Sequence, residues 1–190
     1  MKDIVYKNLT EEELKEEFLK YFTLKDWDAS ERCTELNIIT DYIIEKYLPM
    51  DFVPVVFDKI KDESFYDIEF DCIIINEDYL YKPDATIRLM LMELRHRYQV
   101  KVLINEKSDH KIINQIKEEL LDDSYPSNYD DSKELSDYLS NTKTIDRFAF
   151  MVVMLEEIWS LSYHYPQSSL DYIIHEYAKK YRDILIKENK

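Results

Sequence analysis

The sequence of 190 residues contains no glycine. At the usual frequency of about 7%, a chain of this length would carry about 13. The phosphate loop GxxxxGK[ST], the dinucleotide turn GxGxxG and the nucleophile elbow GxSxG all need a glycine backbone. Their absence excludes nucleotide-dependent and serine-hydrolase functions built on them. Turns with positive φ must use Asn or Asp instead, and we expect Asn76, Asn105 and Asn141 at such positions.

Cysteines and long apolar runs are also scarce. The two cysteines, Cys33 and Cys72, lie far apart and form no CxxC pair, which excludes a metal knuckle or a disulfide framework and fits a reducing cytosol. The N-terminal residues 1–17 lack the apolar region of a secretion signal, and 18 apolar residues never occur together. The sequence therefore predicts a cytoplasmic protein with no membrane segment.

Positively charged residues are also few relative to negatively charged ones. Twenty-five Lys and Arg face 40 Asp and Glu, which gives a formal net charge of −15. Such a balance argues against direct binding of nucleic acid along a basic face. It favours a protein partner with a basic surface, and the nucleic-acid-binding surfaces of other proteins are of that kind. Hydrophobic residues make up 45% of the chain, which is enough for a packed core.

The remaining pattern predicts a single α+β domain, residues 1–190, that is mostly helical with a small sheet. Two N-terminal helices are expected within 1–50: Thr10 is the N-cap of the first, and the second starts after Asp28 and stops at Pro49. Residues 52–76 are rich in β-branched and aromatic types and predict two or three strands. Asp84 is the expected N-cap of a helix over 85–98, and the predicted core spans 51–160. Helices over 108–121, 143–163 and 168–188 follow, and the last forms a C-terminal unit within 161–190.

Helix 85–98 contains the most informative motif. Glu93 and His96 form the ExxH half of the zinc-protease signature HExxH. In the full signature, two histidines one turn apart bind Zn²⁺ and the glutamate polarises a metal-bound water. Met92 stands here at the position of the first histidine.

The surrounding residues resemble those of bacterial zincin-like metallopeptidases. In that family a strand ending I-x-I-N precedes a helix that reads roughly H-E-L-R-H-x-x-Q, and the matching residues are 73–76, 92–96 and Gln99. The resemblance covers about residues 52–160 and implies a zincin-like fold with the sheet beside the ExxH helix. It also implies a third ligand, often Glu, from a later helix. Thr144 occupies that position in the run 144–150.

Two of the three expected ligands are thus replaced. A thioether such as Met92 suits copper(I) rather than a water-activating zinc. Asp146 lies two residues past Thr144, about 200° around the helix, so it does not share the Thr144 face. We therefore predict no bound metal or other cofactor and no catalysis, with Met92, Glu93, His96, Thr144 and Asp146 as remnants of a lost site.

Three other interpretations stay open. In the first, Glu93, Arg95, His96 and Arg97 simply form helix-surface and buried ion pairs and have no other role. The protein can be a zinc metallopeptidase with unusual ligands, namely His96, Asp146 and a third residue. It can also be a helical scaffold with a chance ExxH and no sheet. The remaining histidines are interpreted as structural: His110 and His164 at helix ends, and His175 in an HExxK run that does not chelate.

The leading functional hypothesis is a non-catalytic, acidic, protein-binding module on a degenerate zincin-like scaffold. One concrete form is an inhibitor from a phage or another mobile element, similar to anti-CRISPR proteins, that occupies a nucleic-acid-binding groove. Carboxylates of 61–78 and 122–137 would then imitate phosphates. The predicted contact residues are Asp122, Asp123, Asp130 and Asp131.

Overall fold

The computed structural model describes residues 27–122, 141–164, 166 and 168–186, together with residues 10, 12, 13, 16 and 19. At the first predicted helix start, the Thr10 amide donates to Glu13 Oε2 at 2.7 Å and the Glu13 amide donates to Thr10 Oγ1 at 3.3 Å. The predicted capping box is therefore confirmed.

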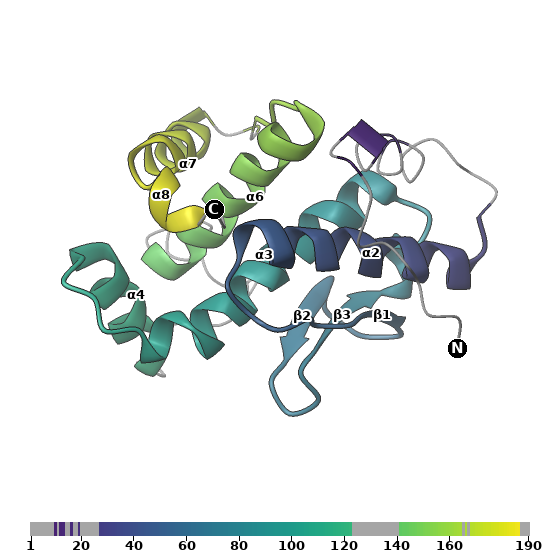
Figure 1. Cartoon of the computed structure of the whole chain (residues 1–190), viewed down its shortest axis with the longest axis horizontal. Helices are drawn as coiled ribbons and strands as arrows, with labels where there is room; N and C mark the ends of the chain where they lie inside the picture. The colour runs from purple at the N-terminus through teal and green to yellow at the C-terminus, as the bar shows by residue number, and fades with distance from the viewer. Residues whose placement is uncertain are drawn as a thin grey trace.

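The described elements form a mostly helical α+β fold, as the sequence predicted (Figure 1). The helices are α2 (Ala29–Tyr47), α3 (Pro83–Lys101), α4 (Lys111–Leu121), α6 (Thr142–Trp159), α7 (Ser168–Lys180) and α8 (Arg182–Leu185). The strands are β1 (Val55–Asp58), β2 (Ser64–Asp67) and β3 (Cys72–Asn76). Among the described helices, none is both long and apolar enough to cross a bilayer.

The sheet has the strand order β1-β3-β2. β1 pairs with β3 in parallel, with Val55 opposite Ile73, and β2 pairs with β3 in antiparallel, with Tyr66 also opposite Ile73. These three side chains are buried, and α2 and α3 lie over the sheet in Figure 1. Alternation of buried and exposed side chains is the pattern of a sheet with one covered face.

The outer edge of β1 is completed by a side chain of α2. The Val55 amide donates to Asn37 Oδ1 at 2.8 Å, and Asn37 Nδ2 donates to the Val55 carbonyl at 2.9 Å. This amide side chain replaces one residue of a neighbouring strand. It satisfies backbone groups at an edge that would otherwise offer them to another strand.

Helix α3 is the centre of the fold and packs against β2, β3, α4 and α6. Its predicted core stripe is confirmed, because all five members are at most 1% exposed: Ile87, Met90, Leu91, Leu94 and Tyr98. Its predicted cap is wrong. Lys82 is the N-cap and Pro83 is the first helical residue, because a proline lacks the N–H that this position leaves unpaired.

Two further local predictions are corrected. Among the described residues, only Asp71 (φ 50°) and Ser160 (φ 54°) have positive φ, so the expectation for Asn76, Asn105 and Asn141 is wrong. Asn76 instead caps the short 3₁₀ helix Glu77–Tyr79, and Asn141 caps α6, each through its side-chain oxygen. The predicted helix over 168–188 is also interrupted, because α7 ends at Lys180 and α8 begins at Arg182.

Candidate functional site

The ExxH helix carries an unusual number of buried polar side chains. Glu93 and Arg97 are each 4% exposed, while Arg95 and Gln99 are fully buried. Charged groups withdrawn from water need partners, because an unpaired buried charge is very costly. The neighbouring helix α6 and the β2–β3 hairpin supply most of these partners.

Arg95 and Asp146 form a fully buried ion pair between α3 and α6. Arg95 Nε lies 2.7 Å from Asp146 Oδ2, and Arg95 Nη2 lies 3.0 Å from Oδ1. Gln99 Nε2 donates to Oδ2 at 2.7 Å, and the Tyr177 hydroxyl donates to Oδ1 at 3.2 Å. Both carboxylate oxygens therefore accept two hydrogen bonds each. This environment makes Asp146 a counterion of Arg95 and leaves it no role as a replacement metal ligand.

Glu93 is paired in a similar way with Arg147 of α6. Its Oε1 lies 2.8 Å from Arg147 Nη2 and accepts a hydrogen bond from Ser64 Oγ at 3.0 Å. Burial opposes ionisation of this carboxyl group, but the Arg147 guanidinium and the His96 ring outweigh it and lower the pKa of Glu93 to about 2. A carboxylate with so low a pKa is a poor proton acceptor at neutral pH.

His96 lies beside this pair, with Nδ1 3.4 Å from Glu93 Oε2. Burial lowers the pKa of His96, the Arg147 guanidinium lowers it further, and Glu93 offsets only part of the effect. The lowered pKa favours the neutral form of the ring. The His96 and Tyr66 rings form a T-shaped pair, with their centroids 6.1 Å apart.

Arg97 connects the same helix to the β2–β3 hairpin. Its Nε and Nη2 lie 2.8 and 2.9 Å from the two carboxylate oxygens of Asp71, and its Nη1 donates to the Asp51 carbonyl at 2.7 Å. The Tyr66 hydroxyl also donates to Asp71. The Arg97 guanidinium holds the pKa of Asp71 well below its usual range. Glu93, Arg95 and Arg97 thus each form an ion pair, with Arg147, Asp146 and Asp71 respectively.

The residues present do not fit a zinc centre at the ExxH motif. Met92 offers a thioether, and its carbonyl accepts a hydrogen bond from Arg147 Nε at 3.3 Å. Thr144, at the expected third-ligand position, is 2% exposed. In the part of the chain that the structure describes, no group of three His, Cys, Asp or Glu ligands includes Glu93 or His96. The Arg147 guanidinium beside both residues also repels a second cation.

Sequence reasoning missed one other cluster. His164, Asp171 and His175 bring one potential ligand atom each to within 4.8 Å of one another. His164 and His175 were interpreted separately as structural residues. The available signal was the i, i+4 spacing of Asp171 and His175, which places both on one face of a helix.

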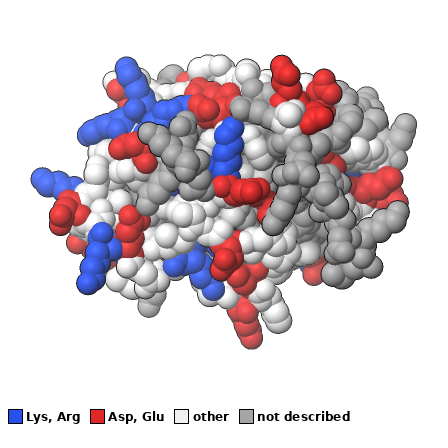
Figure 2. Space-filling view, in the orientation of Figure 1, with Lys and Arg blue, Asp and Glu red and all other residues white. Residues whose placement is uncertain are grey.

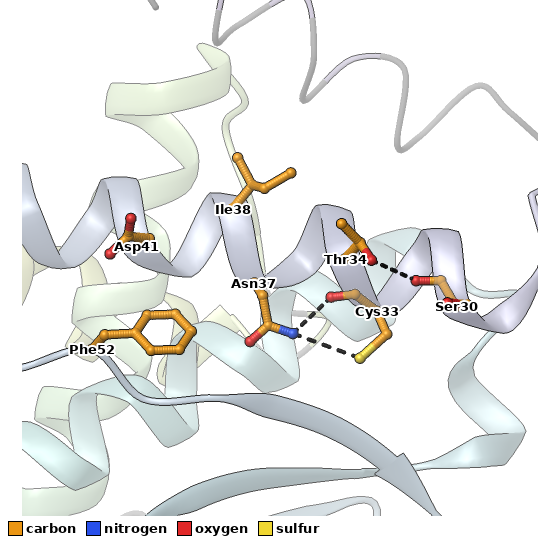
Figure 3. A pocket seen from close by; sticks show the side chains of 7 residues that line it. All are labelled: Ser30, Cys33, Thr34, Asn37, Ile38, Asp41 and Phe52. Carbon is orange, nitrogen blue, oxygen red and sulfur yellow. Dashed lines mark hydrogen bonds between the residues drawn. The ribbon is translucent and has the colours of Figure 1, made fainter. Parts of the chain in front are cut away.

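A pocket of about 540 Å³ lies between α2 and Phe52 (Figure 3). Its polar groups already serve the fold. Asn37 donates to the Cys33 carbonyl at 2.7 Å, and the Cys33 thiol donates to the Val55 carbonyl at 3.2 Å. Burial raises the pKa of Cys33, so this thiol is a weak nucleophile at neutral pH. We assign no chemistry to the pocket.

The predicted acidic surface comprises segments 61–78 and 122–137, with four predicted contact residues in the second. Asp122 is exposed at the C-terminal end of α4, whereas Asp123, Asp130 and Asp131 lie outside the described residues. Segment 61–78 contains seven acidic residues and one lysine. On the face seen in Figure 2, carboxylates occur throughout, while Lys and Arg gather mainly on the side of α4 and α7.

In comparisons with protein-family models, with characterised proteins and with solved structures, no match to this chain was found.

Proposed function

We propose that this protein is a non-catalytic, acidic, protein-binding module on a degenerate zincin-like scaffold. The observation that carries the proposal is that the carboxylates at and beside the ExxH motif are already paired with arginines. The carboxylates of Glu93 and Asp146 each face an arginine, at 2.8 Å from Arg147 and 2.7 Å from Arg95. Glu93, the residue that polarises the metal-bound water in the full HExxH signature, is here the ion-pair partner of Arg147 and joins α3 to α6.

The β2–β3 hairpin supports a binding role. Its turn projects away from the helices in Figure 1 and exposes Ile68 and Phe70, whose exposed fractions are 61% and 74%. The turn is well defined, because Asp67 Oδ1 accepts from the amides of Glu69 and Phe70 at 2.9 and 3.0 Å. Two large apolar side chains on a hydrogen-bonded turn resemble the anchors of protein interfaces.

The charge of the same region supports a basic partner. Of the seven acidic residues in 61–78, Asp62, Glu63, Glu69, Glu77 and Asp78 are exposed. Charge complementarity of this kind speeds association and selects partners. The finer proposal is that the partner is a nucleic-acid-binding protein. In that case the chain acts as an inhibitor of phage or mobile-element type, similar to anti-CRISPR proteins.

The test is capture of partners from the host cytosol by three tagged versions of the full chain. These are the wild type, a hairpin variant (Asp62→Lys with Glu69→Lys) and a control with the same charge change on exposed residues of α7 and α8 (Glu176→Lys with Asp183→Lys). We expect one protein to be retained by the wild type and the control and lost by the hairpin variant. Added nucleic acid should displace it, and its association rate should fall as salt rises.

A matched pair of variants separates this function from the enzymatic alternative. Glu93→Gln and His96→Ala alter the ExxH motif and leave the exposed residues of the hairpin turn, Ile68, Glu69 and Phe70, unchanged. If they abolish partner capture or inhibition while the hairpin variant has no effect, the binding-module proposal is wrong. The ExxH region would then be the working surface.

A further inference from the structure

Two imidazoles lie beside one carboxylate where the chain passes from α6 to α7. His164 belongs to the connection, and Asp171 and His175 belong to α7. His164 Nδ1 lies 3.0 Å from Asp171 Oδ2, and His175 Nε2 lies 3.3 Å from Asp171 Oδ1. The two imidazole rings face each other at a centroid distance of 5.1 Å with a tilt of 31°. The three potential ligand atoms lie within 4.8 Å of one another.

The local fold explains this convergence. Asp171 and His175 are one turn apart on α7 and therefore point the same way. His164 comes from the segment after α6, which leaves the helix through the left-handed residue Ser160. Next to it, Tyr163 is attached to α3, because its hydroxyl accepts a hydrogen bond from Arg88 and its ring lies 4.8 Å from the Arg88 guanidinium.

The attachment of Tyr163 also places a backbone oxygen at the cluster. The Tyr163 carbonyl oxygen lies 3.0 Å from His175 Nε2. In a tetrahedral zinc site with bonds of about 2.0–2.1 Å, neighbouring ligand atoms are about 3.3 Å apart. His164 Nδ1 and His175 Nε2 lie 3.0 and 3.3 Å from different oxygens of Asp171. One ligand atom from each of the three residues lies within 4.8 Å of the others, so the side chains draw closer together around a bound ion. His164 is exposed over 67% of its side chain, so its ring has room to turn toward an ion.

We propose that His164, Asp171 and His175 form a binding site for a divalent transition-metal ion such as Zn²⁺, with the Tyr163 carbonyl oxygen beside it. Two imidazoles and one carboxylate suit Zn²⁺, Ni²⁺ or Cu²⁺ rather than Mg²⁺ or Ca²⁺, which take mainly oxygen ligands. The bound ion replaces the hydrogen bonds of this cluster and ties the α6–α7 connection to α7. This site is separate from the ExxH motif and does not depend on the proposed function.

The chain allows a well-controlled test, because its four histidines divide into two pairs. The untagged full chain is titrated with ZnCl₂ by isothermal calorimetry, in parallel with His164→Ala/His175→Ala and with His96→Ala/His110→Ala. We expect one zinc per wild-type chain. The first variant should weaken binding by at least about 100-fold, since even the loss of a group that only orients a ligand costs up to that factor. The second variant should bind like the wild type.

Two supporting measurements keep the test decisive. Circular dichroism of each variant checks that the helices are intact, and thermal unfolding with and without zinc should show a rise in Tm for the wild type and the His96/His110 variant only. Asp171→Asn, which keeps the side-chain shape, should also weaken binding. Absence of zinc binding to the wild type overturns the proposal. Binding that survives in the His164/His175 variant, or that is lost only in the His96/His110 variant, overturns it as well.

Discussion

The α3–α6 interface and the histidine cluster after α6 both contain carboxylates beside basic side chains, but the basic side chains differ. At the interface, Glu93 and Asp146 face guanidinium groups and are buried. In the cluster, Asp171 faces two imidazoles, and His164 is largely exposed. An arginine keeps its proton at any physiological pH, whereas a neutral imidazole has a lone pair for a metal. The basic partner of a carboxylate therefore distinguishes the two cases: an arginine indicates a structural ion pair, and a pair of histidines indicates a candidate metal site.

The largest expected effect comes from breaking the buried ion pair. Asp146→Ala leaves Arg95 charged and unpaired in the core and should cost about 3–5 kcal/mol of unfolding free energy. Urea unfolding measures the loss. The double variant Arg95→Met/Asp146→Leu removes both charges and should recover most of it.

The matched change in the histidine cluster is Asp171→Ala. Asp171 is partly exposed, so this variant should lose less than about 1 kcal/mol. Equal losses in Asp146→Ala and Asp171→Ala would contradict the contrast between the two regions.

The second effect is a dependence on pH. The pKa of Glu93 is lowered from 4.5 to about 2 in the folded protein, so the unfolded chain binds more protons between these values. Its contribution to stability is present above pH 4.5 and is lost as the pH falls toward 2. Unfolding free energies of the wild type should therefore fall over this range, and Glu93→Gln should show a shallower slope. If Glu93→Gln leaves the slope of unfolding free energy against pH unchanged, the Glu93–Arg147 pairing is contradicted. The control is Glu118→Gln, which makes the same change at an exposed residue of α4.

A third test concerns the resemblance to zincin-like enzymes. Met92→His with Thr144→Glu restores the two replaced ligands, and Arg147→Ala removes the nearby cation. The triple variant, made in the His164→Ala/His175→Ala background, should gain zinc affinity by calorimetry. Retaining Arg147 should weaken that affinity by roughly tenfold, which corresponds to about 1.4 kcal/mol of repulsion. No gain in a folded triple variant would count against the zincin-like scaffold.

The smallest effect on stability is expected at the hairpin tip. Ile68→Ser with Phe70→Ser changes exposed side chains and should alter the unfolding free energy by no more than about 0.5 kcal/mol each, while partner capture is lost. Ile73→Ala in the neighbouring strand removes a fully buried side chain and should cost about 2–5 kcal/mol. A large loss of stability in the tip variant would mean that Ile68 and Phe70 serve the fold rather than a partner.

Much of the fold was predictable from local patterns. The β-branched and aromatic residues of 52–76 predicted the sheet, and the apolar stripe from Ile87 to Tyr98 predicted the buried face of α3. Local signals failed where two of them competed. Asp84 is a good N-cap residue, but the helix begins two residues earlier than predicted, at Pro83, because the missing N–H of a proline costs nothing at that position.

The site was less predictable, since its partners come from distant parts of the chain. The sequence shows that Glu93, Arg95 and Arg97 lie on a helix with a buried stripe. It does not show that Arg147, Asp146 and Asp71 are the matching charges, because that depends on how α3, α6 and the hairpin pack. The pairing of His164 with His175 likewise needed the path of the connection between α6 and α7.

One measurement tests the contrast between the two regions most directly. A crystal of the full chain grown with zinc is measured on both sides of the zinc absorption edge, and the anomalous difference map locates the ion. Our interpretation predicts a peak among His164, Asp171 and His175 and no peak beside His96. A peak at His96, with Arg147 displaced from Glu93, would contradict it and would restore the metallopeptidase interpretation.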